Sequence, residues 1–250
     1  MSSDIDIEIT PQILLNAYCS GVFPMAESRD DKKGLMWFSP ENRALIPIED
    51  FHVSSSLRKK IRKFEYKITF DKDFNSVIKN CANIRKETWI NNEIINLYNQ
   101  LHKLGFAHSV EVWNNDMELI GGLYGISIGG AFFGESMFSK VSNASKIALV
   151  YLVARLKIAD FDLLDAQFDN KHLHQFGMYE VPKEEYLEIL HGAIVRDVGF
   201  FDNYSSSVVV EELEEKISIE VSASSLGLSS SINSSSEEVL SLLQSITQTS

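Results

Sequence analysis

Apolar positions recur every three to four residues in several segments of the chain, which predicts amphipathic helices. In the first, Thr10 is a suitable N-cap, Pro11 suits the first helical position and Gly21 ends the helix. The same pattern predicts further helices over residues 73–82, 92–104, 145–159, 172–176 and 183–193. Helices therefore occur along the whole length of the chain up to about residue 195.

Alternating and continuous apolar runs predict the strands, which cover residues 64–70, 108–113, 118–127, 131–137 and 161–168. The second and third of these form a hairpin around the turn at 114–116. Gly121 and Gly122 lie inside its second arm, where they indicate a bulge or a close backbone approach. An antiparallel sheet followed by helix, strand and helix indicates an α+β fold of the N-acyltransferase kind.

Composition changes twice along the chain, and these changes predict its domains. Short proline-bounded aromatic segments near residues 23–25 and 37–40 indicate a small N-terminal domain over 1–45, or the walls of a pocket. Residues 46–209 then form the main domain. The last part, 210–250, holds nine serines between 222 and 236, so we expect a disordered tail with at most a transient helix over 238–246.

Overall composition is that of an ordinary globular protein, with 44% hydrophobic and 23% charged residues among 250. No apolar run approaches the roughly 20 residues that span a bilayer, and the acidic first residues do not resemble a signal peptide. Two cysteines are too few for a disulfide framework or a zinc site. We expect a cytoplasmic protein without a membrane partner, and nothing demands more than a monomer.

The net charge of −12 counts against a nucleic-acid partner, but its distribution weakens that argument. Seven glutamates and one lysine from Glu211 onward account for −6 of it. Residues 58–63 place five cations in six positions, and such a patch can bind phosphates on an acidic protein. A solvated helix face is an equally good interpretation.

The densest candidate for an active site is the segment 134–146, which crowds a carboxylate, hydroxyls and lysines against Phe132, Phe133 and Phe138. Buried polar groups need partners, so such crowding indicates a use for them. Glu135 could bind a cationic substrate group. Spacing alone favours a structural alternative, in which Glu135 pairs with Lys140 or Lys146.

A second candidate is the pair Asp165 and Gln167, which lie on one face of a predicted strand. A carboxylate and an amide there can hold an amine and stabilise charge that develops on it. Glutamine is too weak a base to act alone, so we expect it to orient the amine. The alternative is that Asp165 caps the following turn.

Other chemistries find little support. The histidines have no zinc-ligand spacing, and the serines lack a nucleophile elbow. There is no Walker sequence, and the glycines of 121–130 do not match the dinucleotide fingerprint. We therefore expect no metal and no cofactor.

Taken together, eight segments of this chain resemble the leucyl/phenylalanyl-tRNA–protein transferases, in family order and spacing over residues 11 to about 200. They are Leu14–Tyr18 with Gly21–Met25, Trp37–Pro40 with Arg43, Thr88–Ile90, Leu101–Gly105, Ala107–Trp113, Gly121–Gly125, Gly134–Ser139 with Asn143–Lys146, and Asp165–Gln167. The resemblance implies a GNAT-like fold. It also implies transfer of Leu, Phe and less readily Met from aminoacyl-tRNA to proteins beginning with Arg or Lys, which marks them for degradation.

The resemblance also implies roles for individual residues. Gln167 would lie near the attacking amine and Asp165 would polarise it, while Lys59, Arg62 and Lys63 would bind the tRNA. The implied substrate-binding residues are Met25, Trp89, Leu123, Phe132, Glu135, Ser136, Leu156 and Leu164. Met25 departs from the family, which often has tryptophan there, and Leu123 and Leu156 replace other pocket residues. A slot for the unbranched Cβ of Leu and Phe distinguishes a methylene by only about 1–3 kcal/mol, so we expect some use of Met.

Two alternatives remain open at the level of sequence. An acyl-CoA N-acyltransferase of the same fold should carry a glycine-containing pyrophosphate loop after the strand 131–137, but this chain has residues 138–142 without glycine there. A non-catalytic tRNA-binding module would explain the basic run and leave Asp165, Gln167 and Glu135 without a role.

Overall fold

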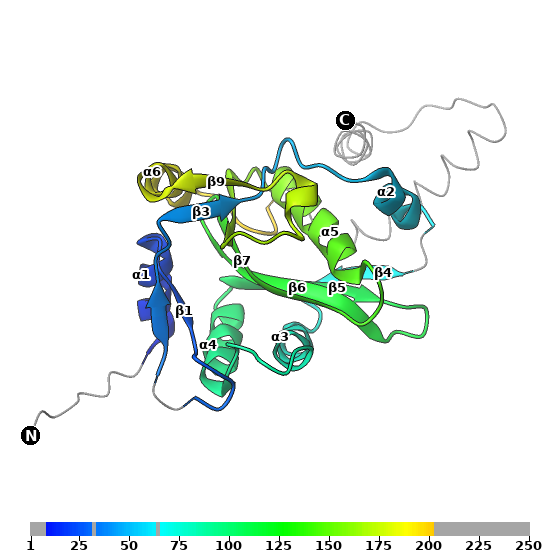
Figure 1. The fold of residues 1–250 in the computed structure, drawn as a ribbon, viewed down its shortest axis with the longest axis horizontal. Coiled ribbons are helices and arrows are strands. Elements are labelled where there is room, and N and C mark those ends of the chain that lie inside the picture. The colour runs from blue at the N-terminus through cyan, green and yellow to red at the C-terminus, as the bar shows by residue number, and fades with distance from the viewer. Residues whose placement is uncertain (1–8, 32–33, 64–65, 203–250) are drawn as a thin grey trace, which may run out of the picture.

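A seven-stranded mixed sheet organises the computed structural model, which describes residues 9–31, 34–63 and 66–202 (Figure 1). The strand order is β4-β5-β6-β7-β8-β3-β9, and β7 and β8 form the parallel pair. The strands are β3 (Asn42–Leu45), β4 (Lys67–Phe70), β5 (Ala107–Trp113), β6 (Leu119–Ile128), β7 (Ala131–Ser139), β8 (Leu163–Gln167) and β9 (Tyr179–Pro182). The predicted tail over 210–250 lies outside the described residues.

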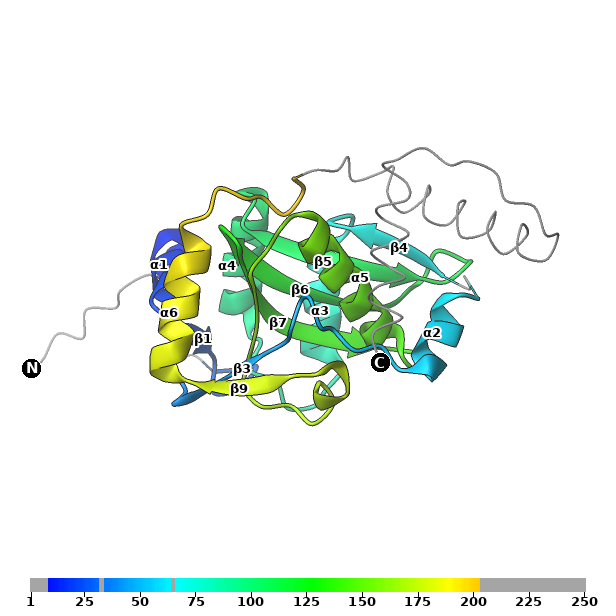
Figure 2. The ribbon, with the colours of Figure 1, turned by 90° about the horizontal axis from the view of Figure 1, so that it is seen from above.

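Helices cover both faces of this sheet (Figure 2). They are α1 (Pro11–Cys19), α2 (Ser55–Ile61), α3 (Phe74–Asn83), α4 (Asn92–Lys103), α5 (Ala144–Ile158) and α6 (Lys183–Ile194), with a 3₁₀ turn at His174–Phe176. The long helix α5 packs on one face, while α3 and α4 lie on the other (Figure 1). No helix in the described ranges is long and apolar enough to cross a membrane.

Local sequence explains most helix ends. Thr10, Ser54, Asp73 and Asn91 each accept a backbone N–H at the start of a helix, which satisfies a donor that the helix cannot. Gly21, Gly105 and Gly177 take positive φ where the chain leaves a helix. The predicted helices are confirmed within a residue or two, except that the one expected over 172–176 is the 3₁₀ turn that begins at His174.

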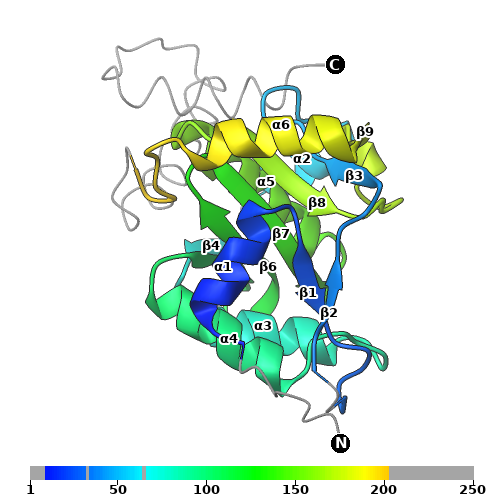
Figure 3. The same cartoon turned by 90° about the vertical axis from the view of Figure 1, so that its left-hand side faces the viewer.

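The strand predictions are confirmed for the hairpin and for the parallel pair, whereas short strands were missed. β3 and β9 lie side by side beyond β8, so a segment from the start of the chain completes the large sheet. Two further strands, β1 (Phe23–Met25) and β2 (Met36–Phe38), form a separate antiparallel pair (Figure 3). The domain boundary near residue 45 stays a prediction.

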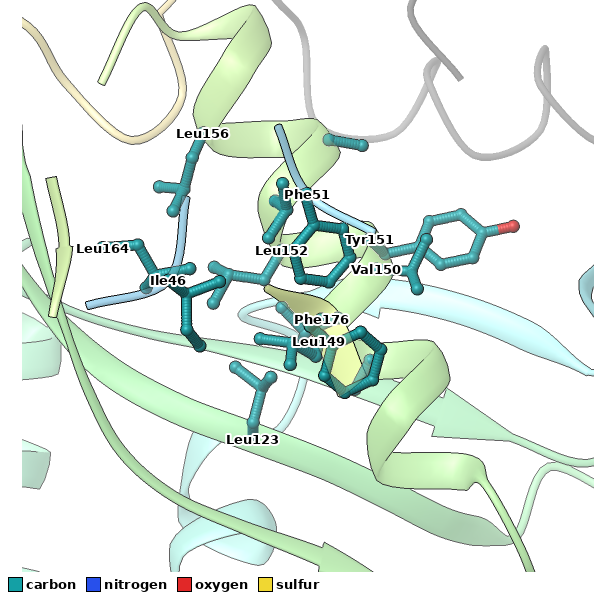
Figure 4. Packing of buried hydrophobic residues seen from close by; sticks show 14 of the residues in the cluster. Ile46, Phe51, Leu123, Leu149, Val150, Tyr151, Leu152, Leu156, Leu164 and Phe176 are labelled. Atoms are coloured by element: carbon teal, nitrogen blue, oxygen red, sulfur yellow. The ribbon is translucent and has the colours of Figure 1, made fainter. Parts of the chain in front are cut away.

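Each face of the sheet has its own apolar core. One core gathers residues of α5, the inner faces of β5 to β8 and the segment 46–53, as Figure 4 shows around Leu123, Leu152 and Phe176. The other joins α1, α3, α4 and α6. Gly121 allows close approach of β6 and α5, because a Cβ there would lie 2.4 Å from the Cβ of Ala144.

Candidate active site

The candidate site lies where β7 and β8 stop pairing. Their parallel register covers Ala131 to Phe133 on β7 and Leu163 to Asp165 on β8, and β7 then continues to Ser139 without a partner in β8. Glu135 and Gln167 follow this point on the two strands. The side chain of Gln167 bridges them, since its Nε2 donates to Glu135 Oε1 at 2.8 Å.

A β-bulge aims Glu135. On β6, Tyr124 pairs with Ser136 and Gly125 pairs with Gly134, so Glu135 is the extra residue between two paired ones. Bulges of this kind redirect a side chain. Here the bulge turns the carboxylate toward α1 and α4, where it accepts hydrogen bonds from Tyr18 Oη at 2.6 Å and Tyr98 Oη at 3.1 Å.

Burial is the largest influence on the Glu135 carboxylate and raises its pKa to about 7, although the hydrogen bonds from Tyr18, Tyr98 and Gln167 act in the opposite direction. The same burial, with the nearby Glu135 charge, raises the pKa values of Tyr18 and Tyr98 well above the ordinary tyrosine value. Both tyrosines therefore keep their hydroxyl protons at neutral pH.

Gln167 is held in an unusual backbone conformation at the end of β8. Its φ of 67° lies in the left-handed region, which a non-glycine residue seldom adopts without surrounding constraints. Because Nε2 is committed to Glu135, the amide oxygen Oε1 points elsewhere, and no described residue donates to it. The amide is oriented with Nε2 toward Glu135 because a carboxylate oxygen accepts the hydrogen bond and Nε2 donates it.

Asp165 lies entirely inside the protein, with 0% of its surface exposed. Its carboxylate accepts from Arg43 Nε at 2.9 Å and Arg43 Nη2 at 2.7 Å, and from Tyr186 Oη at 2.8 Å. It also accepts from the backbone N of Gln167 at 2.7 Å, so the predicted turn-capping interaction is confirmed. Asp165 thus fixes the backbone that carries Gln167.

Arg43 joins four parts of the fold around Asp165. Its guanidinium lies between the rings of Phe23 and Tyr186, 4.6 and 4.5 Å from their centroids, and Nη1 donates to Gly21 O at 3.1 Å. Burial and the adjacent Asp165 charge raise the pKa of Tyr186, so its hydroxyl stays a donor. This arrangement links β1, β3, β8 and α6 (Figure 3).

The alternative pairing of Glu135 with lysine is wrong. Lys146 Nζ donates to Gln175 Oε1 at 2.8 Å, and Lys140 Nζ lies 5.9 Å from the centroid of the Phe138 ring. Ser136 belongs to the site region but faces the Cys81 thiol, whose pKa burial raises to about 12.

The predicted apolar substrate residues are divided between the two faces of the sheet. Met25 and Trp89 are half-buried and belong to the core on the α1 and α4 side, and Ala26 N donates to Trp89 O. The predicted substrate residues on the α5 side are buried. They are Leu123, Phe132, Leu156 and Leu164, and Figure 4 labels all of them except Phe132. Glu135 and Gln167 lie between the two groups, on the strands that separate them.

The predicted tRNA-binding residues lie on and just after α2. Lys59, Arg62 and Lys63 are exposed, beside the end of the sheet that β4 forms (Figures 1 and 2). Arg58 is partly buried and donates from Nε to Val53 O at 3.0 Å. The structure thus leaves these three cations open to a partner.

Four residues of this arrangement had no predicted role: Tyr18, Arg43, Tyr98 and Tyr186. Tyr18 and Arg43 lie in segments that carry the family resemblance, and Tyr98 fits the apolar stripe of its helix. Their partners are 21 to 122 residues away in sequence, so no local spacing could indicate the contacts. The described residues include no group of three or more His, Cys, Asp and Glu placed to hold a metal ion.

This geometry suits acyl transfer to an amine more than metal or nucleophile chemistry. It offers one free amide oxygen that can accept an N–H, and one carboxylate that can change its protonation state near neutral pH. Both are fixed by other side chains before any substrate binds.

Two family models and one solved structure match this chain. The family model "Leucyl/phenylalanyl-tRNA protein transferase" matches residues 45–191, and the model of its N-terminal domain matches residues 7–41. One solved structure, that of L-PGS from Bacillus licheniformis, aligns over 74% of this chain and 77% of its own, with 15% identity and a TM-score of 0.40.

Three relatives are each named leucyl/phenylalanyl-tRNA–protein transferase. The protein of Maricaulis maris is 50% identical over 75% of this chain and 87% of its own length. Those of Afipia carboxidovorans and Paramagnetospirillum magneticum are 49% and 50% identical over 78% of this chain and 86% and 94% of their own lengths. The chain therefore belongs to the leucyl/phenylalanyl-tRNA–protein transferase family, a family of aminoacyltransferases.

Proposed function

We propose that the chain transfers Leu, Phe and less readily Met from aminoacyl-tRNA to the α-amino group of proteins that begin with Arg or Lys. The observation that carries this proposal is the amide of Gln167, whose Nε2 is held by Glu135 and whose oxygen has no donor among the described residues. The family membership supplies the acyl donor. We propose that the protein acts as a monomer in the cytoplasm and needs no cofactor.

In the proposed reaction, Gln167 Oε1 accepts an N–H of the acceptor amine and directs its lone pair at the ester carbonyl. The aminoacyl ester is already activated, so positioning provides much of the rate. The C–N bond forms, the bond to the 3′ oxygen of the tRNA breaks, and that oxygen takes up a proton. Asp165 acts through Gln167, because four donors already occupy its carboxylate.

We propose that the amino-acid side chain of the donor inserts beside Leu123, Phe132, Leu156 and Leu164, between the diverging strands. Met25, Trp89 and Ser136 would contact the terminal adenosine and the aminoacyl ester from the other face. The tRNA body would extend toward Lys59, Arg62 and Lys63. A GNAT-like fold fits this proposal, since α5 connects the parallel strands β7 and β8, and these strands stop pairing after Phe133 and Asp165.

Transfer of radiolabelled Leu from Leu-tRNA to a peptide beginning with Arg tests the proposal. The control is the same peptide beginning with Ala. We expect label on the Arg peptide only, and a loss of about 10² to 10³ in rate for Gln167→Ala with tRNA affinity retained. A chain that binds tRNA but labels neither peptide would be a binding module, and the proposal would fail.

A further inference from the structure

Three oxygen-bearing groups form a closed ring of hydrogen bonds at the site. Tyr18 Oη contacts Glu135 Oε1 at 2.6 Å, Tyr98 Oη contacts Glu135 Oε2 at 3.1 Å, and the two hydroxyls contact each other. Both tyrosines are 0% exposed and come from different helices, α1 and α4. We refer to Tyr18, Tyr98 and the Glu135 carboxylate as the tyrosine–glutamate ring.

The number of protons in this ring does not match the number of contacts. Three oxygen–oxygen contacts need three protons, and the two hydroxyls supply two, because an ionised carboxylate only accepts. Neither tyrosine loses its proton at neutral pH, as their raised pKa values show. A third proton, on Glu135, would give every contact of the ring a hydrogen. The ring is therefore built to accept one proton.

We propose that Glu135 is the general base of the transfer and takes the proton that the acceptor ammonium must lose. This inference rests on the proposed function, because it assigns the proton acceptor in that reaction. The tyrosine–glutamate ring stabilises the proton once it has arrived.

The remaining hydrogen-bonding capacity of Glu135 fits this role. A carboxylate has about four lone-pair positions. Tyr18 and Gln167 occupy two on Oε1, and Tyr98 occupies one on Oε2. One position on Oε2 has no donor among the described residues, and this is the position that the proposal assigns to the proton of an amine held by Gln167.

The groups facing Glu135 from the other elements leave this assignment intact. Tyr124 of β6 and Cys81 of α3 lie beside the ring, and burial raises the pKa of each. Asp165 of β8 carries the nearest other carboxylate, which tends to raise the pKa of Glu135 but is paired with Arg43 at 2.7 Å. Tyr124 and Cys81 therefore keep their own protons near neutral pH and take none from the amine.

Glu135 removes one proton from the ammonium at the open position of Oε2, which leaves a neutral amine whose lone pair forms the C–N bond to the ester carbonyl. Rotation of the new O–H toward Tyr98 Oη then gives the third contact of the ring its hydrogen. The C–O bond to the tRNA breaks, and the second amine proton passes to the 3′ oxygen. Glu135 then releases its proton to solvent. One amide, one tRNA hydroxyl and one proton result.

The test compares two nucleophiles on the full-length chain. One is the α-amine of the Arg peptide, and the other is an α-aminooxy analogue of that peptide, whose nitrogen is uncharged at neutral pH. We expect Glu135→Gln to slow transfer to the amine by about 10²- to 10⁴-fold, and transfer to the aminooxy group by less than about tenfold. Tyr98→Phe keeps the carboxylate but opens the ring, and should show the same selectivity with smaller losses.

Tyr124→Phe is the matched control, since its hydroxyl is buried next to the ring and has no hydrogen-bond partner among the described residues. It should change neither rate by more than about threefold. If Glu135→Gln and Tyr98→Phe each lost the same factor in rate with both nucleophiles, Glu135 would only orient Gln167. That result would overturn the general-base inference and leave the proposed function in place. A wild-type chain inactive with both nucleophiles would overturn the proposed function and this inference with it.

Discussion

Arg43 and Asp165 form an ion pair with 1% and 0% of their side chains exposed. Removing one member of such a pair leaves the other charge buried without its partner, which costs about 3–5 kcal/mol. We expect Arg43→Ala to lower the free energy of unfolding by that amount, as measured with urea. Arg196 is the control, because it pairs with Asp160 and Asp162 at the surface, where solvent screens the charges, so Arg196→Ala should change the free energy of unfolding little. Equal losses for the two variants would contradict the structural role of the buried pair.

Glu135 should make stability depend on pH in a direction unusual for a carboxylate. Its pKa is about 7 in the folded chain, whereas an unfolded glutamate has a pKa of about 4.3. Between these values the folded state keeps a proton that the unfolded state loses, so the contribution of Glu135 to stability falls as pH rises through this window. We expect urea unfolding of Glu135→Gln to lack this decline. If the difference in unfolding free energy between the wild-type chain and Glu135→Gln stayed constant from about pH 4.5 to 7, this result would contradict the raised pKa of Glu135.

At the scale of elements, the contact between β6 and α5 depends on a missing side chain. A Cβ at Gly121 would meet the Cβ of Ala144 at 2.4 Å and its backbone carbon at 3.0 Å, so helix and strand would have to separate. We expect Gly121→Ala to cost about 1–3 kcal/mol of unfolding free energy. Gly192→Ala in α6 meets nothing within 4 Å and should instead stabilise by up to about 1 kcal/mol. Thermal unfolding of both variants measures these changes in stability. A Gly121→Ala chain as stable as the wild type would contradict the close approach of β6 and α5.

The exposed cations on and just after α2 lie close together in sequence, so their contribution to tRNA binding can be measured with one triple variant. Replacing Lys59, Arg62 and Lys63 together with Ala should weaken tRNA binding and lower the slope of log affinity against log salt by about 2 to 3. A triple replacement of Lys79, Lys86 and Lys103, which are exposed around α3 and α4, removes the same charge and should change both quantities less. Equal effects would assign the binding to overall charge instead of α2.

The sequence was sufficient for elements with a strong period or clear end signals, such as α1 and the β5–β6 hairpin. It was insufficient for β3 and β9, because strands of four residues show too little alternation and gain their stability from partners far along the chain. The same limit applies to the site. Asp165, Gln167 and Glu135 could be predicted from their residue types and from the family resemblance. The bulge at Glu135 and the contacts of Tyr18, Tyr98 and Arg43 could not be predicted, because they depend on how distant segments meet.

For the whole molecule, the last described residues belong to the core and are not an appendage. Phe200 is 3% exposed, stacks on His108 with ring centroids 4.2 Å apart, and lies 5.6 Å from the Phe132 ring. Arg155 donates to Phe200 O at 2.7 Å and also to Asp202 O. The chain therefore needs residues up to about 202 to complete the core on the α5 side, although the family model ends at residue 191.

A chain that ends at Asp202 keeps every contact described above and is the reference for a shorter chain. A chain that ends at Arg196 loses the Phe200 ring and two acceptors of Arg155, and should be less stable than this reference by about 3–5 kcal/mol. Phe200→Ala in the full-length chain separates the ring from the backbone acceptors and should account for most of this loss. If the two shortened chains were equally stable, the core on the α5 side would be complete without residues 197–202, and the packing of Phe200 on His108 and Phe132 would contribute nothing to it.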